Sequence, residues 1–85
     1  MFWTANTAAG RYDALIDTTK MSRPMGDREF TAKVVQIILF RDLARPGEEI
    51  PVAEVGLGVH YGATAHEAES EANREFQSWA TTFRA

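Results

Sequence analysis

The sequence has 85 residues, of which 45% are apolar and 25% are charged, and it contains no cysteine. This composition is typical of a small globular protein, and we expect residues 1–85 to form a single domain. The absence of cysteine excludes disulfides, thiolate zinc sites and iron–sulfur clusters. The formal charge of −3 is uneven, since residues 1–43 carry six Lys/Arg and five Asp/Glu, whereas residues 44–85 carry three and seven. An acidic chain lacks the general attraction to phosphate on which nucleic-acid binding depends.

The start of the sequence does not have the pattern of a targeting segment. Residues 1–10 lack a basic start followed by an apolar run, and the most apolar stretch, Val34 to Phe40, is too short to cross a bilayer. We therefore expect a cytoplasmic protein without a membrane partner. Residues 1–10 are expected to be flexible or to fold back over the sheet.

The first predicted element is a short outer strand near residue 12. Tyr12, Ala14 and Ile16 alternate with Asp13 and Asp17, which is the period of a strand with one buried face. The spacing of Ala8, Tyr12, Leu15 and Thr19 would also fit a helix. We prefer the strand.

The run of residues 30–41 predicts a central strand, because both of its faces are apolar in the middle. Alternation places Val34, Ile38 and Phe40 on one face and Val35, Ile37 and Leu39 on the other. A single helix can cover only one of these faces. We expect Val35, Ile37 and Leu39 to project from the uncovered face and to bind a protein partner or a second copy of the chain.

Residues 45–61 predict a turn followed by a third strand. Arg45 to Glu48 has the sequence of a type II turn, in which proline sets the first central position and glycine supplies positive φ at the second. The alternation from Pro51 to Tyr61 then predicts a strand with one buried face.

Residues 64–83 predict one long helix. Thr64 to Glu67 forms a capping box, and apolar residues follow at intervals of three or four. These residues are Ala65, Ala68, Ala72, Phe76, Trp79 and Phe83, of which the aromatic ones should supply most of the burial energy. Together the elements predict an α+β fold with a three-stranded antiparallel sheet and one long C-terminal helix packed on one face, in the order β-β-β-α.

The junction from Gly62 to Ala72, followed by Phe76 and Trp79, resembles that of HicB-type antitoxins, in which a glycine, a threonine cap and a Glu-Ala pair open an alanine-rich helix. The element order is similar too, with Tyr12 opening a first strand. The resemblance implies a β-β-β-α domain that neutralises a toxin.

The same element order, with Gly56 and Gly58 before an alanine-rich helix, also resembles the C-terminal part of double-stranded RNA-binding domains. Those domains hold phosphates with lysines at the start of this helix. This chain has glutamates there, which would repel phosphate, so we expect the RNA site to be absent. The basic residues available for nucleic acid lie in a predicted loop over residues 20–28 and are Lys20, Arg23 and Arg28.

The sequence predicts no catalytic residue, metal site or cofactor. His66 and Glu67 form half of a zinc-protease helix motif, but Ser70 occupies the position of the second histidine, so we interpret both His60 and His66 as surface residues. The helix carboxylates Glu67, Glu69, Glu71 and Glu75 are interpreted as a solvated face. We therefore expect a binding or regulatory module without enzymatic activity, acting through protein association, with nucleic-acid binding or toxin neutralisation as alternatives.

Overall fold

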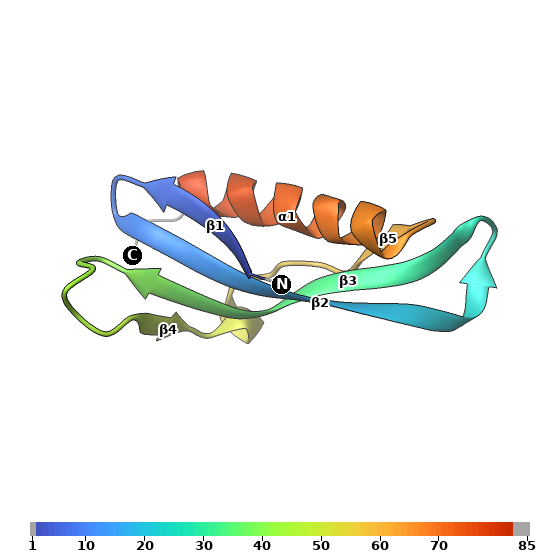
Figure 1. Cartoon of the computed structure of the whole chain (residues 1–85), viewed down its shortest axis with the longest axis horizontal. Coiled ribbons are helices and arrows are strands. Elements are labelled where there is room, and N and C mark those ends of the chain that lie inside the picture. The colour runs from blue at the N-terminus through green and yellow to red at the C-terminus, as the bar shows by residue number, and fades with distance from the viewer. Residues whose placement is uncertain (1, 83–85) are drawn as a thin grey trace.

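The computed structural model describes residues 2–82 and shows an α+β fold with one antiparallel sheet and one C-terminal helix (Figure 1). The elements are β1 (Phe2–Thr7), β2 (Gly10–Met25), β3 (Arg28–Phe40), β4 (Glu48–Ile50), the 3-10 helix η1 (Val52–Glu54), β5 (His60–Gly62) and α1 (Ala65–Thr82). The sheet has five strands instead of the three expected, in the order β1-β2-β3-β4, and β5 pairs with the other end of β3. The helix α1 packs on one face of this sheet.

The hairpin of β2 and β3 is the longest feature of the molecule. It spans 16 and 13 residues, and its free end extends past the start of α1, which gives overall dimensions of 45 × 21 × 20 Å (Figure 1). The segment 20–28, expected to be a loop, belongs to the two strands, but its irregularity is confirmed in part, because residues 21–24 have no register partner on β3. Met25 and Arg28 pair again at the tip, where Gly26 adopts a φ of 65°, a conformation that glycine tolerates, and the chain reverses within two residues.

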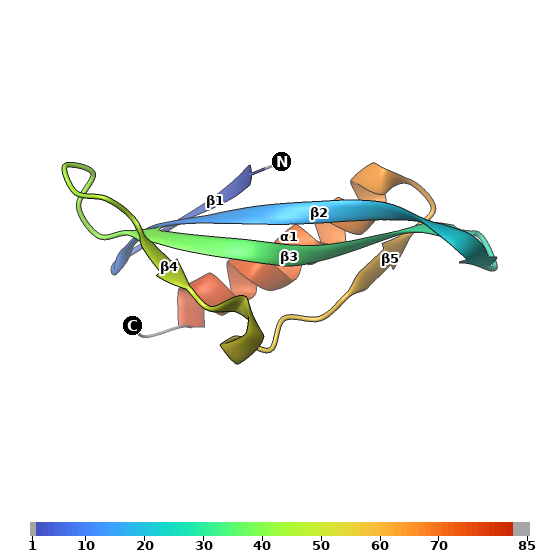
Figure 2. The same ribbon diagram turned by 90° about the horizontal axis from the view of Figure 1, so that it is seen from below.

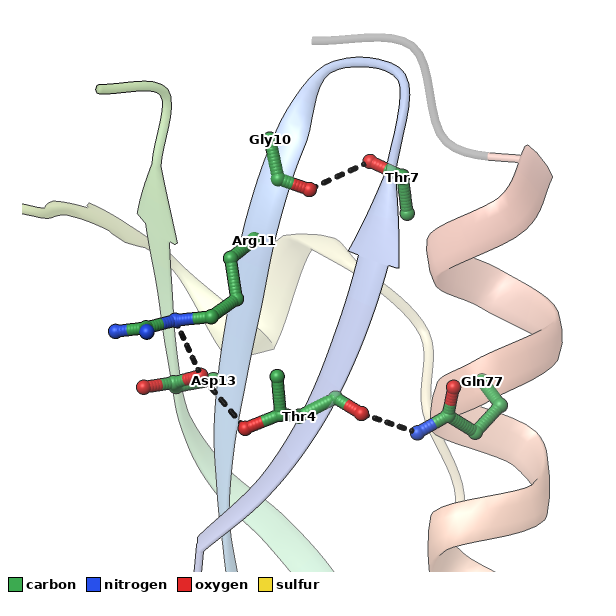
Figure 3. Close-up of polar contacts among 6 residues, drawn as sticks. All are labelled: Thr4, Thr7, Gly10, Arg11, Asp13 and Gln77. Carbon is green, nitrogen blue, oxygen red and sulfur yellow. Dashed lines mark hydrogen bonds and ion pairs between the residues drawn. The ribbon is translucent and has the colours of Figure 1, made fainter. Parts of the chain in front are cut away.

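The first residues form β1, an edge strand that pairs with β2, so β2 lies inside the sheet and is not the outer strand expected. Residues 2–7 thus extend the sheet beside β2 and do not fold over its uncovered face. Trp3 and Ala5 point toward α1, where the Trp3 indole Nε1 donates to Glu69 Oε1 at 2.7 Å. Gln77 Nε2 donates to the Thr4 carbonyl at 2.9 Å and so ties the helix to this strand (Figure 3).

A β-bulge at Val35 decides which residues of β3 face the helix. Ile16 pairs with Val34 and Leu15 pairs with Gln36, which leaves Val35 as an extra residue without a register partner. The alternation therefore changes phase at this point. As a result, Ile37 and Leu39 share the helix side with Val34 and are completely buried.

The segment between β3 and α1 differs most from the expectation. Gly47 does not have positive φ, and the turn is instead closed by Arg45 N donating to the Asp42 carbonyl at 3.0 Å, so the predicted type II turn is wrong. The strand expected over residues 51–61 is reduced to β5. The preceding residues form η1 and an irregular stretch, from which Val52, Val55 and Leu57 pack against the core.

The helix confirms the sequence prediction closely. Glu67 N donates to Thr64 Oγ1 at 3.1 Å, while the Glu67 carboxylate accepts from Ala63 N at 2.8 Å, one residue before the position that a standard capping box would use. The buried helix residues are Ala68, Ala72, Phe76 and Ala80, with Trp79 half-buried beside them. Phe83 lies outside the described residues.

The core lies between α1 and the sheet. Its largest fully buried side chains are Tyr12, Phe76, Ile37 and Leu39. The Tyr12 and Trp79 rings meet edge to face at 5.2 Å between centroids, and Phe76 stacks on Trp79 at 6.3 Å. Near its start α1 approaches β5 closely, since a Cβ atom at Gly62 would lie 2.6 Å from Ala68 N.

Candidate interaction surface

The face of the sheet opposite α1 is the first candidate surface. Seen from below, β2 and β3 lie in front and α1 lies behind them, so no described helix covers the near side (Figure 2). The register fixes which side chains share this face. Phe2, Leu15 and Gln36 form one cross-strand row, and Asp13 lies opposite Ile38 in the next. We call this surface the helix-free face.

The helix-free face carries large apolar side chains that the protein leaves accessible. Phe2 is 55% exposed and Val35 at the bulge is 40% exposed, while Leu15 and Ile38 are half-buried. Gly47 runs so close to this face that a Cβ atom there would lie 2.8 Å from the Phe40 ring, so the loop before β4 forms a rim at one end. Accessible apolar groups on a sheet face are typical of an interaction site.

Charged residues surround the apolar centre of the helix-free face. Asp13 Oδ1 accepts from Thr4 Oγ1 at 3.0 Å and pairs with Arg11 Nε at 3.3 Å (Figure 3). The Arg11 guanidinium also lies 4.8 Å from the centre of the Phe40 ring, in a cation–π contact. Toward the hairpin tip, Asp17 lies directly opposite Lys33.

Of the three partner-binding residues predicted from the sequence, only Val35 is accessible. Ile37 and Leu39 are 0% exposed and belong to the core under α1, so their expected projection from the uncovered face is wrong. The bulge is the physical reason, because a one-residue insertion moves every later side chain to the opposite face. The sequence analysis did not assign Leu15 and Ile38 to the helix-free face. Strand alternation places both of them there once the phase change at Val35 is taken into account.

The three predicted nucleic-acid residues all lie on the projecting hairpin. Lys20, Arg23 and Arg28 are exposed, and Arg28 opens β3 opposite the end of β2. The exposed acidic residues Asp27 and Glu29 lie next to them. The basic charge of this tip is therefore partly compensated.

A polar depression of about 650 Å³ lies on the other side of the molecule, between the hairpin turn, β5 and the start of α1. Its lining includes both histidines, His60 and His66, together with Glu67, Ser70 and Glu71. In the described residues, no three histidine or carboxylate side chains come close enough together to hold a metal ion.

His60 and Glu75 form the main polar link between the irregular stretch before β5 and the helix. His60 is not simply a surface residue, since its Nε2 lies 2.9 Å from Glu75 Oε1, which also accepts from Gly58 N at 2.8 Å. The hydrogen bond with His60 is the largest cause that lowers the pKa of Glu75. Partial burial of the carboxylate raises this pKa, whereas the hydrogen bond from the Gly58 amide and the charge of His60 lower it further. Glu75 is thus an acceptor with two partners and not only part of a solvated face.

Tyr12 is the other group with a perturbed pKa. Its burial in the core raises the pKa of the phenol, and the positive charge of Arg41 opposes this shift. A buried neutral phenol packed against Trp79 serves the core.

Comparison with protein-family models, curated proteins and solved structures finds no match to this chain. In residues 2–82, no helix combines the length and the apolar character required to traverse a membrane.

Proposed function

We propose that this protein is a non-catalytic binding module that associates with a protein partner through the helix-free face. The observation that supports this proposal most strongly is the accessible apolar row on a sheet face without a covering helix, formed by Phe2 and Leu15 with Val35 beside it. Burying one such side chain in an interface is worth roughly 1.5–3 kcal/mol relative to full exposure. The surrounding charges would set the orientation of the partner.

Site-specific photo-crosslinking in cells that express the protein tests this proposal. A benzoyl-phenylalanine residue replaces Phe2 or Val35 on the helix-free face, and Ser78, exposed on α1, serves as the control position. We expect a discrete crosslinked protein species at the two sheet positions and none at Ser78. Equal crosslinking at all three positions, or none at any, would contradict a specific interface on this face.

Nucleic-acid binding by the projecting hairpin is a second candidate, favoured by one observation. The hairpin tip extends beyond the helix and exposes Lys20, Arg23 and Arg28 in a two-stranded ribbon, a shape that a nucleic-acid groove can accept (Figure 1). The acidic neighbours of these residues weaken the attraction to phosphate.

A salt titration of RNA and DNA binding tests the second candidate. If the hairpin contacts phosphates, the double variant Arg23→Glu/Arg28→Glu should bind more weakly and show a shallower salt slope, by about one unit per lost phosphate contact. Arg45→Glu is the control, since Arg45 is 83% exposed in a different loop. Undetectable binding of the wild type at low salt would exclude this role.

A further inference from the structure

We propose that a second copy of this chain occupies the helix-free face. A two-fold axis relates the two copies, and it runs parallel to β2 and β3, above the helix-free face and over the midline between these strands. This inference rests on the proposed function, since it names the partner of the same face. The supporting observations are the register of charged residues on β2 and β3 and the size of the face.

The register makes the charges of this face self-complementary. Asp17 on β2 lies directly opposite Lys33 on β3, and both side chains are exposed. A two-fold axis between these strands superimposes β2 of one copy on β3 of the other at the same level. Asp17 then faces the second copy's Lys33, and Lys33 faces the second copy's Asp17, so that one charge pair produces two contacts across the interface.

The same rotation brings two further rows of the face into contact and places Asp13 over the second copy's Ile38 at the level between them. Arg11 lies opposite Phe40 in the register, so each guanidinium comes over the second copy's Phe40 ring, the kind of group that it already contacts within its own chain. Leu15 comes over the second copy's Gln36 beside the exposed Val35. Leu15 and Val35 are thereby enclosed between two sheets, which pack about 10 Å apart.

A two-fold axis across the strands would be less favourable. Asp13 and Asp17 stand two residues on either side of Leu15 on the same strand and the same face. Rotation about an axis through Leu15 perpendicular to β2 would place Asp17 over the second copy's Asp13. Two carboxylates facing each other would then repel, whereas the axis along the strands opposes unlike charges.

The size of the face is sufficient for a specific dimer. The two longest dimensions of the molecule are 45 and 21 Å. A sheet face within these limits offers an area on the order of the ~800 Å² per partner that a standard interface buries.

Charge reversal with mixing tests the proposed axis by analytical ultracentrifugation. The wild type should dimerise as its concentration rises through the micromolar range. Asp17→Lys and Lys33→Asp should each weaken self-association at least about tenfold, because each places two pairs of like charges across the two-fold axis. An equimolar mixture of these two variants should form a heterodimer, since every such pair then becomes attractive, and the doubly exchanged chain Asp17→Lys/Lys33→Asp should dimerise again by itself.

Arg74→Asp is the matched control, because it changes the net charge as much as Lys33→Asp but lies 78% exposed on α1 and should leave dimerisation unchanged. Circular dichroism establishes that each variant is folded. A wild type that stays monomeric to high concentration overturns the homodimer but leaves the proposed function intact if Phe2 and Val35 still crosslink to another protein. A wild-type dimer that the doubly exchanged chain does not restore overturns the axis along the strands.

Discussion

His60 Nε2 and Glu75 Oε1 lie 2.9 Å apart, and the same carboxylate oxygen accepts a hydrogen bond from the Gly58 amide. One side chain of α1 therefore holds both a histidine of β5 and the backbone that leads into this strand. These contacts fix the irregular stretch before β5 against the helix. They matter because the register with β3 covers only residues 60–62, so the backbone of this stretch is not held by a ladder.

The lowered pKa of Glu75 predicts a specific loss of stability in acid. A carboxyl group whose pKa is lower in the folded state stabilises the fold above its ordinary pKa of about 4.5 and loses this contribution as the pH falls through the folded value. The wild type should therefore lose its stability advantage over Glu75→Gln as the pH decreases below about 4.5. Urea denaturation of both proteins between neutral pH and about pH 3 measures this difference, with Glu54→Gln in η1 as a control. A difference that stays constant with pH would mean that the pKa of Glu75 is not lowered by folding.

The helix cap predicts unequal effects at its two residues. Thr64→Ala removes the acceptor for the Glu67 amide and should lower the free energy of unfolding by about 1 kcal/mol. Glu67→Gln should cost less, because the glutamine carbonyl oxygen can still accept from the Ala63 amide. Thermal or urea unfolding of the two variants tests this order. Equal, negligible losses would show that the cap contributes nothing to stability.

Gly62 predicts a packing constraint at the strand-to-helix junction. A Cβ atom at this position would lie 2.6 Å from Ala68 N and 2.8 Å from Glu67 Cβ, so Gly62→Ala forces the helix away from β5 and should cost about 1–3 kcal/mol. Gly58→Ala is a matched control, because a Cβ there meets only Glu75 Oε1, at 4.0 Å. Urea midpoints of the two variants measure the contrast. A fully tolerated Gly62→Ala would mean that α1 does not approach β5 this closely.

The sequence predicts the helix and its start well because both depend on local chemistry. The Thr64 hydroxyl and the Glu67 carboxylate act within one helical turn, and the apolar stripe follows a single period to Ala80. The central position of the strand over residues 30–41 is also confirmed, since an apolar run on both faces suits a strand between neighbours.

The bulge and the irregular stretch could not be predicted because their causes are not local. Nothing about Val35 distinguishes it from its neighbours, and it becomes the extra residue only because β2 pairs on both sides of it. The alternation of Val55 and Leu57 with glycines has the period of a strand, yet these side chains pack on the core from a segment without a ladder. Trp3 and Ala5 alternate with Thr4 and Asn6, which is the period of a strand, and Gly10, with a φ of 138°, lies at the turn into β2. The segment is too short for this period alone to identify a partner strand.

The phase change at Val35 predicts opposite outcomes for two substitutions that uninterrupted alternation would treat alike. Ile37 is completely buried in the core between the sheet and α1, so Ile37→Lys places a charge in the core without a partner and should cost at least about 3–5 kcal/mol, enough to unfold many small proteins. Val35 is 40% exposed at the bulge, so Val35→Lys should change stability by less than about 1 kcal/mol while weakening association through the helix-free face. Circular dichroism and urea unfolding measure the first effect, and sedimentation of the folded Val35→Lys protein measures the second. If Val35→Lys unfolds the protein and Ile37→Lys does not, the bulge lies elsewhere in β3 and the helix-free face must be assigned to the other set of side chains.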